Sequence, residues 1–273
     1  MPLTMTQANP TVDGIQLIVE GAAGHTVVML HGWPDTRRLW DDTVQALQGR
    51  YQCVRFTMPG FDSRLPPRAT SLADMTVMLR RIVRSVSPGK PVTLLMHDWG
   101  CVFGYEFAAR HPDLVARIVA VDIGDHNSDV LIRSRSLKAK LQVLVYQAWL
   151  ALAWKFGGSL GTGMTRWMAR QMRCTSSQSR ITWQMNYPYA MQWMGLLGGF
   201  RAALPVEPHC PTLYIYGQRK PFMFQSARWL DKLAARPGCK VQAFATGHWV
   251  MVQQPQEFKQ AVLEWLRSVP LQN

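Results

Sequence analysis

The chain has 273 residues, of which 48% are apolar and 17% charged, with 20 Gly and 17 Pro. This composition is that of an ordinary globular protein, and the length excludes a mini-protein that needs covalent staples because it is ample for a multilayer core. Thirty basic residues against 17 acidic ones give a net charge of +13, which favours an anionic partner.

Short strand patterns alternate with helical patterns through the first half of the chain. The predicted strands cover residues 15–20, 26–30, 52–57, 92–96 and 118–122, and helical patterns fill 71–86 and 100–110. From about Asp125 to Pro205 the strand patterns stop, and the segment is helical and rich in Trp and Met. Alternation resumes with strands at 212–216 and 241–245 and helices at 226–234 and 255–268. This order predicts an α/β protein with a parallel sheet and a helical insertion.

The insertion carries most of the excess positive charge. Between Asn127 and Val206 there are ten basic residues and one acid, Asp129. A solvated basic face is the plain interpretation, and attraction to an anionic membrane surface is the alternative; we expect no nucleic-acid partner. We predict a core domain of residues 1–126 and 207–273 and a helical cap of residues 127–206.

The strongest motif is LLMHDWGCVFGYEFAARHP at 94–112, in which an apolar strand runs into Asp98 and a helix starts at Gly100. A side chain on such a turn projects from the carboxyl end of the sheet, beside the amides and the positive dipole end of the next helix. A carboxylate there is ionised without a base, and its attack through oxygen gives an ester that water can cleave. Asp98 is therefore the candidate nucleophile, and a capping role is the alternative.

Two further motifs complete the candidate site. In MLHGWPDTRRLW at 29–40 a stiff turn follows an apolar strand, and the backbone N–H groups of Trp33 and Trp99 are candidates for an oxyanion hole. His248 follows the last predicted strand and precedes the last helix, so a loop is expected to bring it over the carboxyl edge of the sheet as the base that activates water.

These motifs resemble the α/β-hydrolase superfamily, specifically the branch of epoxide hydrolases and haloalkane dehalogenases that uses Asp in place of Ser. The matching pieces are HGWP at 31–34, MPGFDSR at 58–64, HDWG at 97–100 and TGHWVMVQQPQEF at 246–258. The resemblance implies an α/β-hydrolase core with an inserted helical cap, Asp98 as nucleophile, His248 as base, and the Trp33 and Trp99 amides as oxyanion hole.

The acid partner of His248 departs from the family pattern. The family usually places an Asp in a GxxD pattern after the strand at 212–216, but this sequence reads GQRK at 217–220. Some dehalogenases of the family place the acid after the strand that follows the nucleophile's helix, and the matching position is Asp122, with Asp125 as the next candidate. A turn or capping role is the alternative for Asp122.

Opening of an epoxide needs a proton donor opposite the nucleophile, and Tyr hydroxyls donate while neutral. Tyr146, followed by Gln147, resembles the Tyr-Gln pair in the cap of epoxide hydrolases, and MNYPYAMQW supplies Tyr187 and Tyr189 as candidates for the second donor. Packing in a core is the alternative for each.

Other features bear on the alternatives. A dehalogenase needs two donors for the departing halide; Trp99 fits one, and only Trp149 or Trp154 in the cap is left for the other. Met96 stands where the family prefers Gly, which could crowd the turn. The run GGSLGTG at 157–163 is expected to be a loop between cap helices.

Five scattered cysteines without a CxxC pair indicate neither a disulfide framework nor a zinc site, and no motif suggests a cofactor. The N-terminus MPLTMTQANP lacks the pattern of a secretory signal, so we expect a cytoplasmic protein. The expected function is hydrolysis of a small, largely apolar epoxide to a diol. The alternatives are a haloalkane dehalogenase and, in another class, a non-catalytic binding protein on a hydrolase scaffold. The sequence leaves the oligomeric state open.

Overall fold

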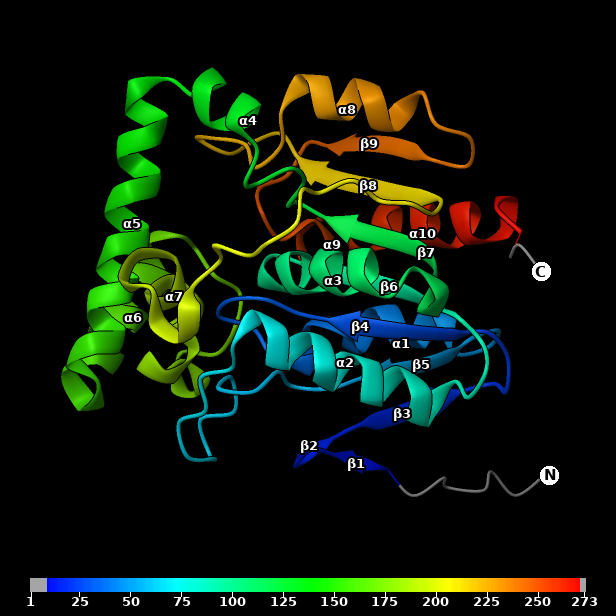
Figure 1. The fold of residues 1–273 in the computed structure, drawn as a ribbon, viewed down its shortest axis with the longest axis horizontal. Helices are drawn as coiled ribbons and strands as arrows, with labels where there is room; N and C mark the ends of the chain where they lie inside the picture. Colours follow the sequence, from blue (N-terminus) through cyan, green and yellow to red (C-terminus); the bar gives the residue numbers. More distant parts are fainter. Residues whose placement is uncertain (1–8, 271–273) are drawn as a thin grey trace.

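The computed structural model describes residues 9–270; residues 1–8, on which the prediction about a secretory signal largely depends, and residues 271–273 lie outside the described part. A seven-stranded sheet of order β3-β5-β4-β6-β7-β8-β9 forms the centre of the molecule (Figure 1). Its strands are β3 (Ile18–Gly21), β4 (Thr26–Leu30), β5 (Gln52–Arg55), β6 (Val92–His97), β7 (Val115–Val121), β8 (Thr212–Gly217) and β9 (Lys240–Phe244). Only β3 pairs in the antiparallel direction, so the carboxyl ends of β4 to β9 meet at one edge.

The strand predicted at 15–20 is interrupted. The short pair β1 (Thr11–Val12) and β2 (Ile15–Gln16) forms a separate two-stranded sheet, and β3 joins the main sheet after it. Leu17, between β2 and β3, donates its backbone N–H to Pro10 and buries its side chain completely. The alternation of apolar and polar residues is the same in an interrupted strand as in a continuous one, so the sequence could not predict this interruption.

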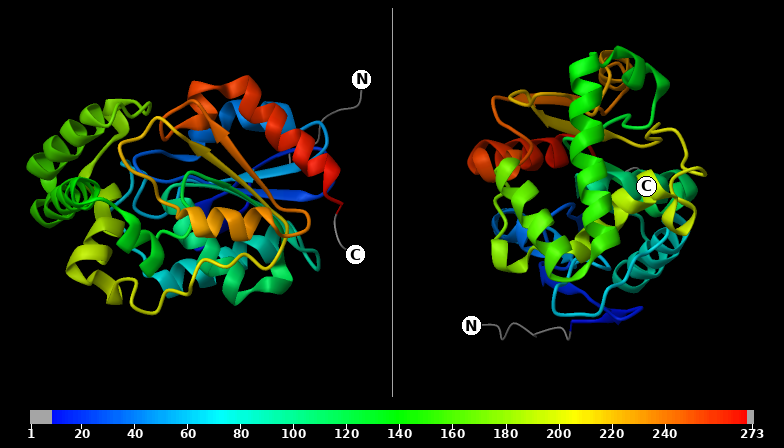
Figure 2. Two further views of the ribbon diagram at one scale, coloured as in Figure 1. Left: turned by 90° about the horizontal axis from the view of Figure 1, so that it is seen from above. Right: turned by 90° about the vertical axis from the view of Figure 1, so that its left-hand side faces the viewer.

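Helices cover both faces of the sheet, as the two views of Figure 2 show. One face carries α2 (Leu72–Val86), α3 (Trp99–Arg110) and α8 (Ala227–Ala234); the other carries α1 (Asp41–Leu47), α9 (Val250–Gln253) and α10 (Pro255–Ser268). Alternate side chains of each buried strand serve the two faces: on β4, Val28 and Leu30 pack toward α2 and α3, while Val27 and Met29 pack toward α1 and α10. The sheet therefore has one hydrophobic core on each of its two faces.

The chain between β7 and β8 is helical and lies beyond the carboxyl ends of the parallel strands (Figure 1). It contains α4 (Asp129–Ser134), α5 (Leu137–Phe156), α6 (Gly158–Gln171) and α7 (Tyr187–Met194), with one-turn 3-10 helices at Gln178–Arg180, Trp183–Asn186 and Leu196–Gly198. Its division from the core at residues 127 and 206 stays a prediction.

The prediction of a loop at 157–163 is wrong, because α6 begins at Gly158 and contains most of the GGSLGTG run. One of the glycines, Gly161, serves the packing of this helix: a side chain there would collide with the carbonyl of Ala153 on α5 and come within 3.0 Å of Trp183 Cβ. A glycine-rich stretch is compatible with a helix where it lets two helices approach this closely.

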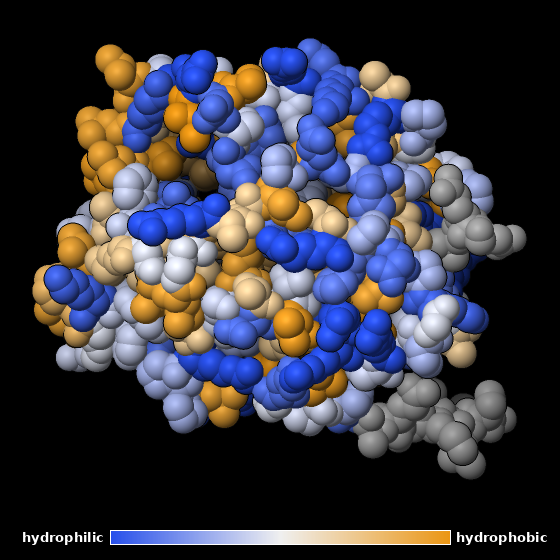
Figure 3. Space-filling view, in the orientation of Figure 1, coloured by the Kyte–Doolittle hydropathy of each residue, from blue (hydrophilic) through white to orange (hydrophobic). Residues whose placement is uncertain are grey.

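The outer face of α5 is apolar. Six large apolar side chains on it are at least 42% exposed: Leu137, Leu141, Leu144, Val145, Leu152 and Phe156. Figure 3 shows apolar side chains gathered at the upper left, over this part of the molecule. Within residues 9–270, α5 and the other helices all fall short of the length and apolarity that crossing a membrane requires.

Candidate active site

Asp98 occupies the sharp turn between β6 and α3. Its backbone has φ of 51° and ψ of −122°, outside the regions that L-residues prefer, at a cost of about 1–3 kcal/mol. Two glycines make room for the turn: a Cβ at Gly32 would lie 2.6 Å from the Trp99 nitrogen, and a Cβ at Gly100 would lie 2.6 Å from the Leu30 oxygen. The strained backbone thus aims the Asp98 side chain away from α3 and over the edge of the sheet.

One Asp98 oxygen is already held by a backbone amide. The Trp33 N–H donates to Asp98 Oδ1 at 2.6 Å. The Trp99 amide is the first of α3, where helical N–H groups have no partner inside the helix. Of the two amides predicted as an oxyanion hole, that of Trp33 contacts the Asp98 carboxylate, and that of Trp99 belongs to the next residue in the chain.

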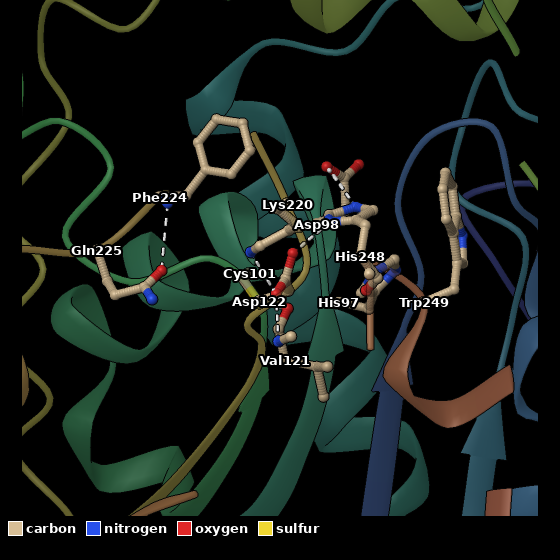
Figure 4. A network of polar contacts seen from close by, with 12 residues as sticks. His97, Asp98, Cys101, Val121, Asp122, Lys220, Phe224, Gln225, His248 and Trp249 are labelled. Atoms are coloured by element: carbon tan, nitrogen blue, oxygen red, sulfur yellow. Dashed lines mark hydrogen bonds and ion pairs between the residues drawn. The ribbon is translucent and has the colours of Figure 1, made fainter. Parts of the chain in front are cut away.

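His248 lies in the loop between β9 and α9 and contacts two carboxylates (Figure 4). Its Nε2 is 3.5 Å from Asp98 Oδ2, and its Nδ1–H donates to Asp122 Oδ2. Asp98 comes from the end of β6 and Asp122 from the end of β7, which pair in parallel, so both carboxylates reach the same edge. The structure brings the predicted Asp98, His248 and Asp122 together in that order.

Asp122 is fully buried and held on its second oxygen by β8 and the loop that follows it. Its Oδ1 accepts from the Gly217 N–H at 3.0 Å and from Lys220 Nζ at 2.5 Å, and the Lys220 side chain is only 6% exposed. Lys220 thus stands where the family's acid was expected and pairs with the acid supplied by the neighbouring strand.

Asp125, the other candidate for the acid, is engaged elsewhere. Its carboxylate accepts from the N–H and Oγ of Ser226, both at 2.7 Å, and from Ser128 Oγ at 2.6 Å. Ser226 is the N-cap of α8, so Asp125 fastens this helix to the chain that leaves β7.

The three charges stabilise one another. Burial raises the pKa of both Asp98 and Asp122. The interaction with His248 outweighs burial at Asp98, and the interactions with Lys220 and His248 outweigh it at Asp122. The pKa of each carboxyl therefore lies below its usual range. Burial lowers the pKa of His248, but the charges of Asp122 and Asp98 and the hydrogen bonds to them raise it to about 9. In the free protein His248 is therefore an imidazolium between two carboxylates.

The other two motif histidines are neutral and structural. His31 Nε2 accepts from the Met58 N–H at 3.0 Å, and burial lowers the pKa of His31 to about 4. His97 packs its ring 4.4 Å from that of His248 and donates from Nε2 to the His248 carbonyl at 3.2 Å; burial lowers its pKa to about 3. Both support the turns that carry the site.

Asp35 was not singled out from the sequence, although it follows HGWP directly. It is 1% exposed and accepts from Trp249 Nε1 at 2.9 Å and from Ser176 Oγ at 2.5 Å. Burial raises the pKa of Asp35 to about 6. It ties the helical segment, through Ser176, to the loop that carries His248. Its contacts come from residues more than 140 positions away, so no local pattern could have indicated them.

A cavity of about 780 Å³ opens above Asp98. The described residues that line it include Asp98 and Trp99 from the core and Tyr146, Gln147 and Tyr189 from the helices opposite. Within residues 9–270, no group of three or more His, Cys, Asp or Glu side chains is arranged to hold a metal ion.

The two cavity tyrosines lie close together. Tyr146, on α5, accepts a hydrogen bond from Gln147 Nε2 at 2.9 Å, and its ring lies 6.2 Å from that of Tyr189 on α7. The Tyr189 ring stands edge-on to Trp99 at 5.1 Å, beside the nucleophile turn. Burial raises the pKa of both hydroxyls, which keeps them protonated and able to donate.

Tyr187 does not belong to this pair. It is completely buried, its ring packs against Phe61 at 5.9 Å and Phe103 at 6.5 Å, and it is not among the cavity-lining residues. Its hydroxyl has no hydrogen-bond partner among the described residues. The structure therefore places only Tyr146 and Tyr189 opposite Asp98.

Met96 does not crowd the turn. It is fully buried on the side of β6 that faces α3, and its sulfur occupies the space that a side chain at Gly104 would need. A glycine one helical turn along α3 thus accommodates the larger residue on the strand.

Comparison with known proteins agrees with this architecture. A family model described as the alpha/beta hydrolase family matches residues 27–261. A crystal structure of the epoxide hydrolase of Bacillus megaterium in complex with an inhibitor superposes with a TM-score of 0.70 over 94% of this chain and 99% of that chain, at 19% identity. At that identity the likeness concerns the fold.

Curated relatives match parts of the chain. The "Probable oxidoreductase EphD" of Mycobacterium tuberculosis is 36% identical over 118 residues, which are 40% of this chain and 20% of that protein. The "Soluble epoxide hydrolase" of Corynebacterium sp. is 27% identical over 125 residues, 45% of this chain and 43% of that protein. The chain thus matches less than half the length of these relatives.

Proposed function

The chain belongs to the alpha/beta hydrolase family, and on this premise we propose that it hydrolyses epoxides to diols through a covalent ester on Asp98. The observation that carries the proposal is the placement of Tyr146 and Tyr189 across one cavity from Asp98. A carboxylate nucleophile on one side and two neutral hydroxyl donors on the other suit the opening of a strained ring whose oxygen must be protonated.

In the first half-reaction Asp98 Oδ2 attacks an epoxide carbon, and the carbon–oxygen bond of the ring breaks. The ring oxygen takes a proton from Tyr146 or Tyr189, which leaves a hydroxyl on the alkyl ester and a tyrosinate on the enzyme. Oδ2 is the less tightly held oxygen, because Oδ1 accepts the Trp33 N–H at 2.6 Å whereas Oδ2 lies 3.5 Å from His248 Nε2. No proton needs to leave His248 in this step.

Ester formation prepares the second half-reaction. Neutralising Asp98 removes its charge and its hydrogen bond from the contributions that raise the pKa of His248. The pKa of His248 then falls, its proton is passed to the tyrosinate to restore the Tyr hydroxyl, and the neutral imidazole becomes a base when a water must be activated. His248 takes a proton from water, and the water oxygen attacks the carbonyl carbon of the Asp98 ester.

The charge that develops during this attack lies on Asp98 Oδ1, against the amides of Trp33 and Trp99, which are fixed before reaction begins. The ester bond breaks, the departing diol oxygen takes the proton from His248, and the remaining proton of the Asp98 carboxyl returns to His248, which restores the imidazolium. The balance is one epoxide and one water consumed for one diol. Asp122 keeps the His248 tautomer and stabilises its charged form.

Haloalkane dehalogenation is the second candidate, and one observation favours it: Trp99 Nε1 is buried without a hydrogen-bond partner among the described residues. The expected second halide donor is less favourable. Trp149 Nε1 donates to the Met164 carbonyl at 3.0 Å, and neither Trp149 nor Trp154 lines the cavity. The non-catalytic alternative rests on the missing acid at 220 and on the basic charge of segment 127–206. Asp122 beside His248 favours an enzyme instead.

The proposal is tested with the His248→Gln variant, which blocks only ester hydrolysis. Incubation with an epoxide panel is expected to leave an ester on Asp98, seen by intact mass and mapped by peptide mass. Asp98→Asn is the matched control and should acquire no adduct. Adducts from haloalkanes alone would establish the dehalogenase, and no adduct from either panel would refute both activities.

A further inference from the structure

The lining of the cavity carries more positive than negative charge. Three cations line it, Arg135, Lys140 and Arg201, whereas Asp98 is the only carboxylate among its lining residues. None of the three cations forms an ion pair with a carboxylate of residues 9–270. The wall of the cavity therefore carries one anionic group, the nucleophile, and three cations that have no carboxylate partner among the described residues.

Arg135 is the cation that the fold holds in place. It follows α4 directly, its Nη2 donates to the Met223 carbonyl at 3.0 Å, and its guanidinium carbon lies 5.3 Å from the centroid of the Phe224 ring. Its Nε–H is buried and has no hydrogen-bond partner among the described residues. Leaving a buried donor on a charged group unsatisfied costs free energy, which an anionic ligand would recover.

Neither Asp125 nor Tyr146 forms a hydrogen bond with Arg135. The Asp125 carboxylate already accepts hydrogen bonds from Ser128 and Ser226, and the neutral Tyr146 hydroxyl accepts a hydrogen bond from Gln147. No neighbouring side chain in the described chain therefore takes the role of a carboxylate partner for Arg135.

Aromatic rings connect Arg135 with Tyr146, the proposed proton donor. The Tyr146 ring stacks on Phe222 at 5.9 Å, Phe222 meets Phe224 edge-on at 5.4 Å, and Phe224 underlies Arg135. Two aromatic rings thus separate the proton donor from the guanidinium. Along the cavity wall the side chains include Val143, Leu144 and Phe224, which suit an apolar chain.

We propose that Arg135 forms an anion subsite, and that the substrates of this protein are epoxides that carry a carboxylate at the end of an apolar chain. Arg135 lines the cavity, and its guanidinium can offer the N–H groups that its bond to Met223 leaves free to the oxygens of a carboxylate, a charge-assisted pair. The substrate part of this inference rests on the proposed function; the subsite itself does not.

The subsite is tested first by binding without chemistry. Titration calorimetry of the whole protein with octanoate should give saturable binding that methyl octanoate lacks. Arg135→Gln should weaken octanoate binding about 10- to 100-fold, the loss expected for charge-assisted hydrogen bonds, and Arg135→Lys should restore part of it. Arg133→Gln is the matched control and should bind like the parent, because Arg133 is 84% exposed and faces Asp129.

Turnover then tests the substrate class. A terminal epoxide of a medium-chain fatty acid should exceed its methyl ester in kcat/KM by about tenfold or more, and Arg135→Gln should remove the preference. Equal turnover of acid and ester would overturn the inference while leaving the epoxide hydrolase intact. Arg135-dependent binding of octanoate without epoxide turnover would leave the subsite and refute the activity. Octyl phosphate that binds where octanoate does not would overturn the carboxylate assignment.

Discussion

The buried pair of Lys220 and Asp122 predicts a strong energetic coupling that a double-mutant cycle measures. Lys220 Nζ lies 2.5 Å from Asp122 Oδ1, with the side chains 6% and 0% exposed. At an effective dielectric constant of about 20, unit charges about 4 Å apart attract by about 4 kcal/mol. Removing either partner leaves the other charge buried and uncompensated, which typically costs about 3–5 kcal/mol of unfolding free energy.

We therefore expect Lys220→Met and Asp122→Asn each to destabilise the protein by about 3–5 kcal/mol in denaturant unfolding. The double variant should recover much of this loss, because no unpaired charge remains. The coupling energy of the cycle should then reach several kcal/mol.

Activity separates the two roles of this pair. Asp122→Asn, alone or in the double variant, presents an amide to His248 Nδ1 and favours the wrong tautomer, so ester hydrolysis should fall by about 10⁴. Lys220→Met keeps the carboxylate, and loss of a nearby positive charge should raise the pKa of His248, so the rate of ester hydrolysis shifts to higher pH. A Lys220→Met variant of parental stability, or additive losses in the cycle, would refute the reasoning.

Three further outcomes are expected. The pKa of His248 is raised to about 9, so protonation of His248 stabilises the fold fully below about pH 6.5, and this contribution is lost as the pH rises through 9. The free energy of unfolding of the parent, relative to that of His248→Gln, should therefore fall by about 3 kcal/mol between about pH 6 and pH 10. A difference in denaturant unfolding that stays constant over this range would contradict the assignment. Phe at Tyr146 or Tyr189 should slow ester formation about 10²-fold or more in single-turnover assays, whereas Tyr187→Phe should not; equal losses at all three would mean that the cavity pair has no special role. If the basic segment 127–206 attracts anionic membranes, the protein should sediment with phosphatidylglycerol vesicles at low salt and be released at high salt, and failure to sediment at low salt would exclude that partner.

The choice between the neighbouring candidates Tyr187 and Tyr189 was beyond the reach of the sequence. Residues two apart on a helix point in widely different directions, so only one of the pair can face the cavity. Which one does depends on how α7 is rotated against the core, and that rotation is set by contacts of Tyr187 with Phe61 and Phe103, far away in the chain.

The order of strands and helices, the parallel sheet and the turn at Asp98 could be predicted from the sequence, because these features depend on local patterns of apolar residues and on the glycine motifs at Gly32 and Gly100. Which carboxylate meets His248, and what Lys220 does there, depends on contacts between distant parts of the chain. Asp122 and Asp125 both follow the end of β7 within four residues, and their roles differ because the loop after β8 presents Lys220 to Asp122 whereas α8 presents Ser226 to Asp125. Such pairs join residues about 100 positions apart. A sequence that carries the acid on one strand end and a lysine on the next therefore does not reveal their ion pair until the order of strands in the sheet is known.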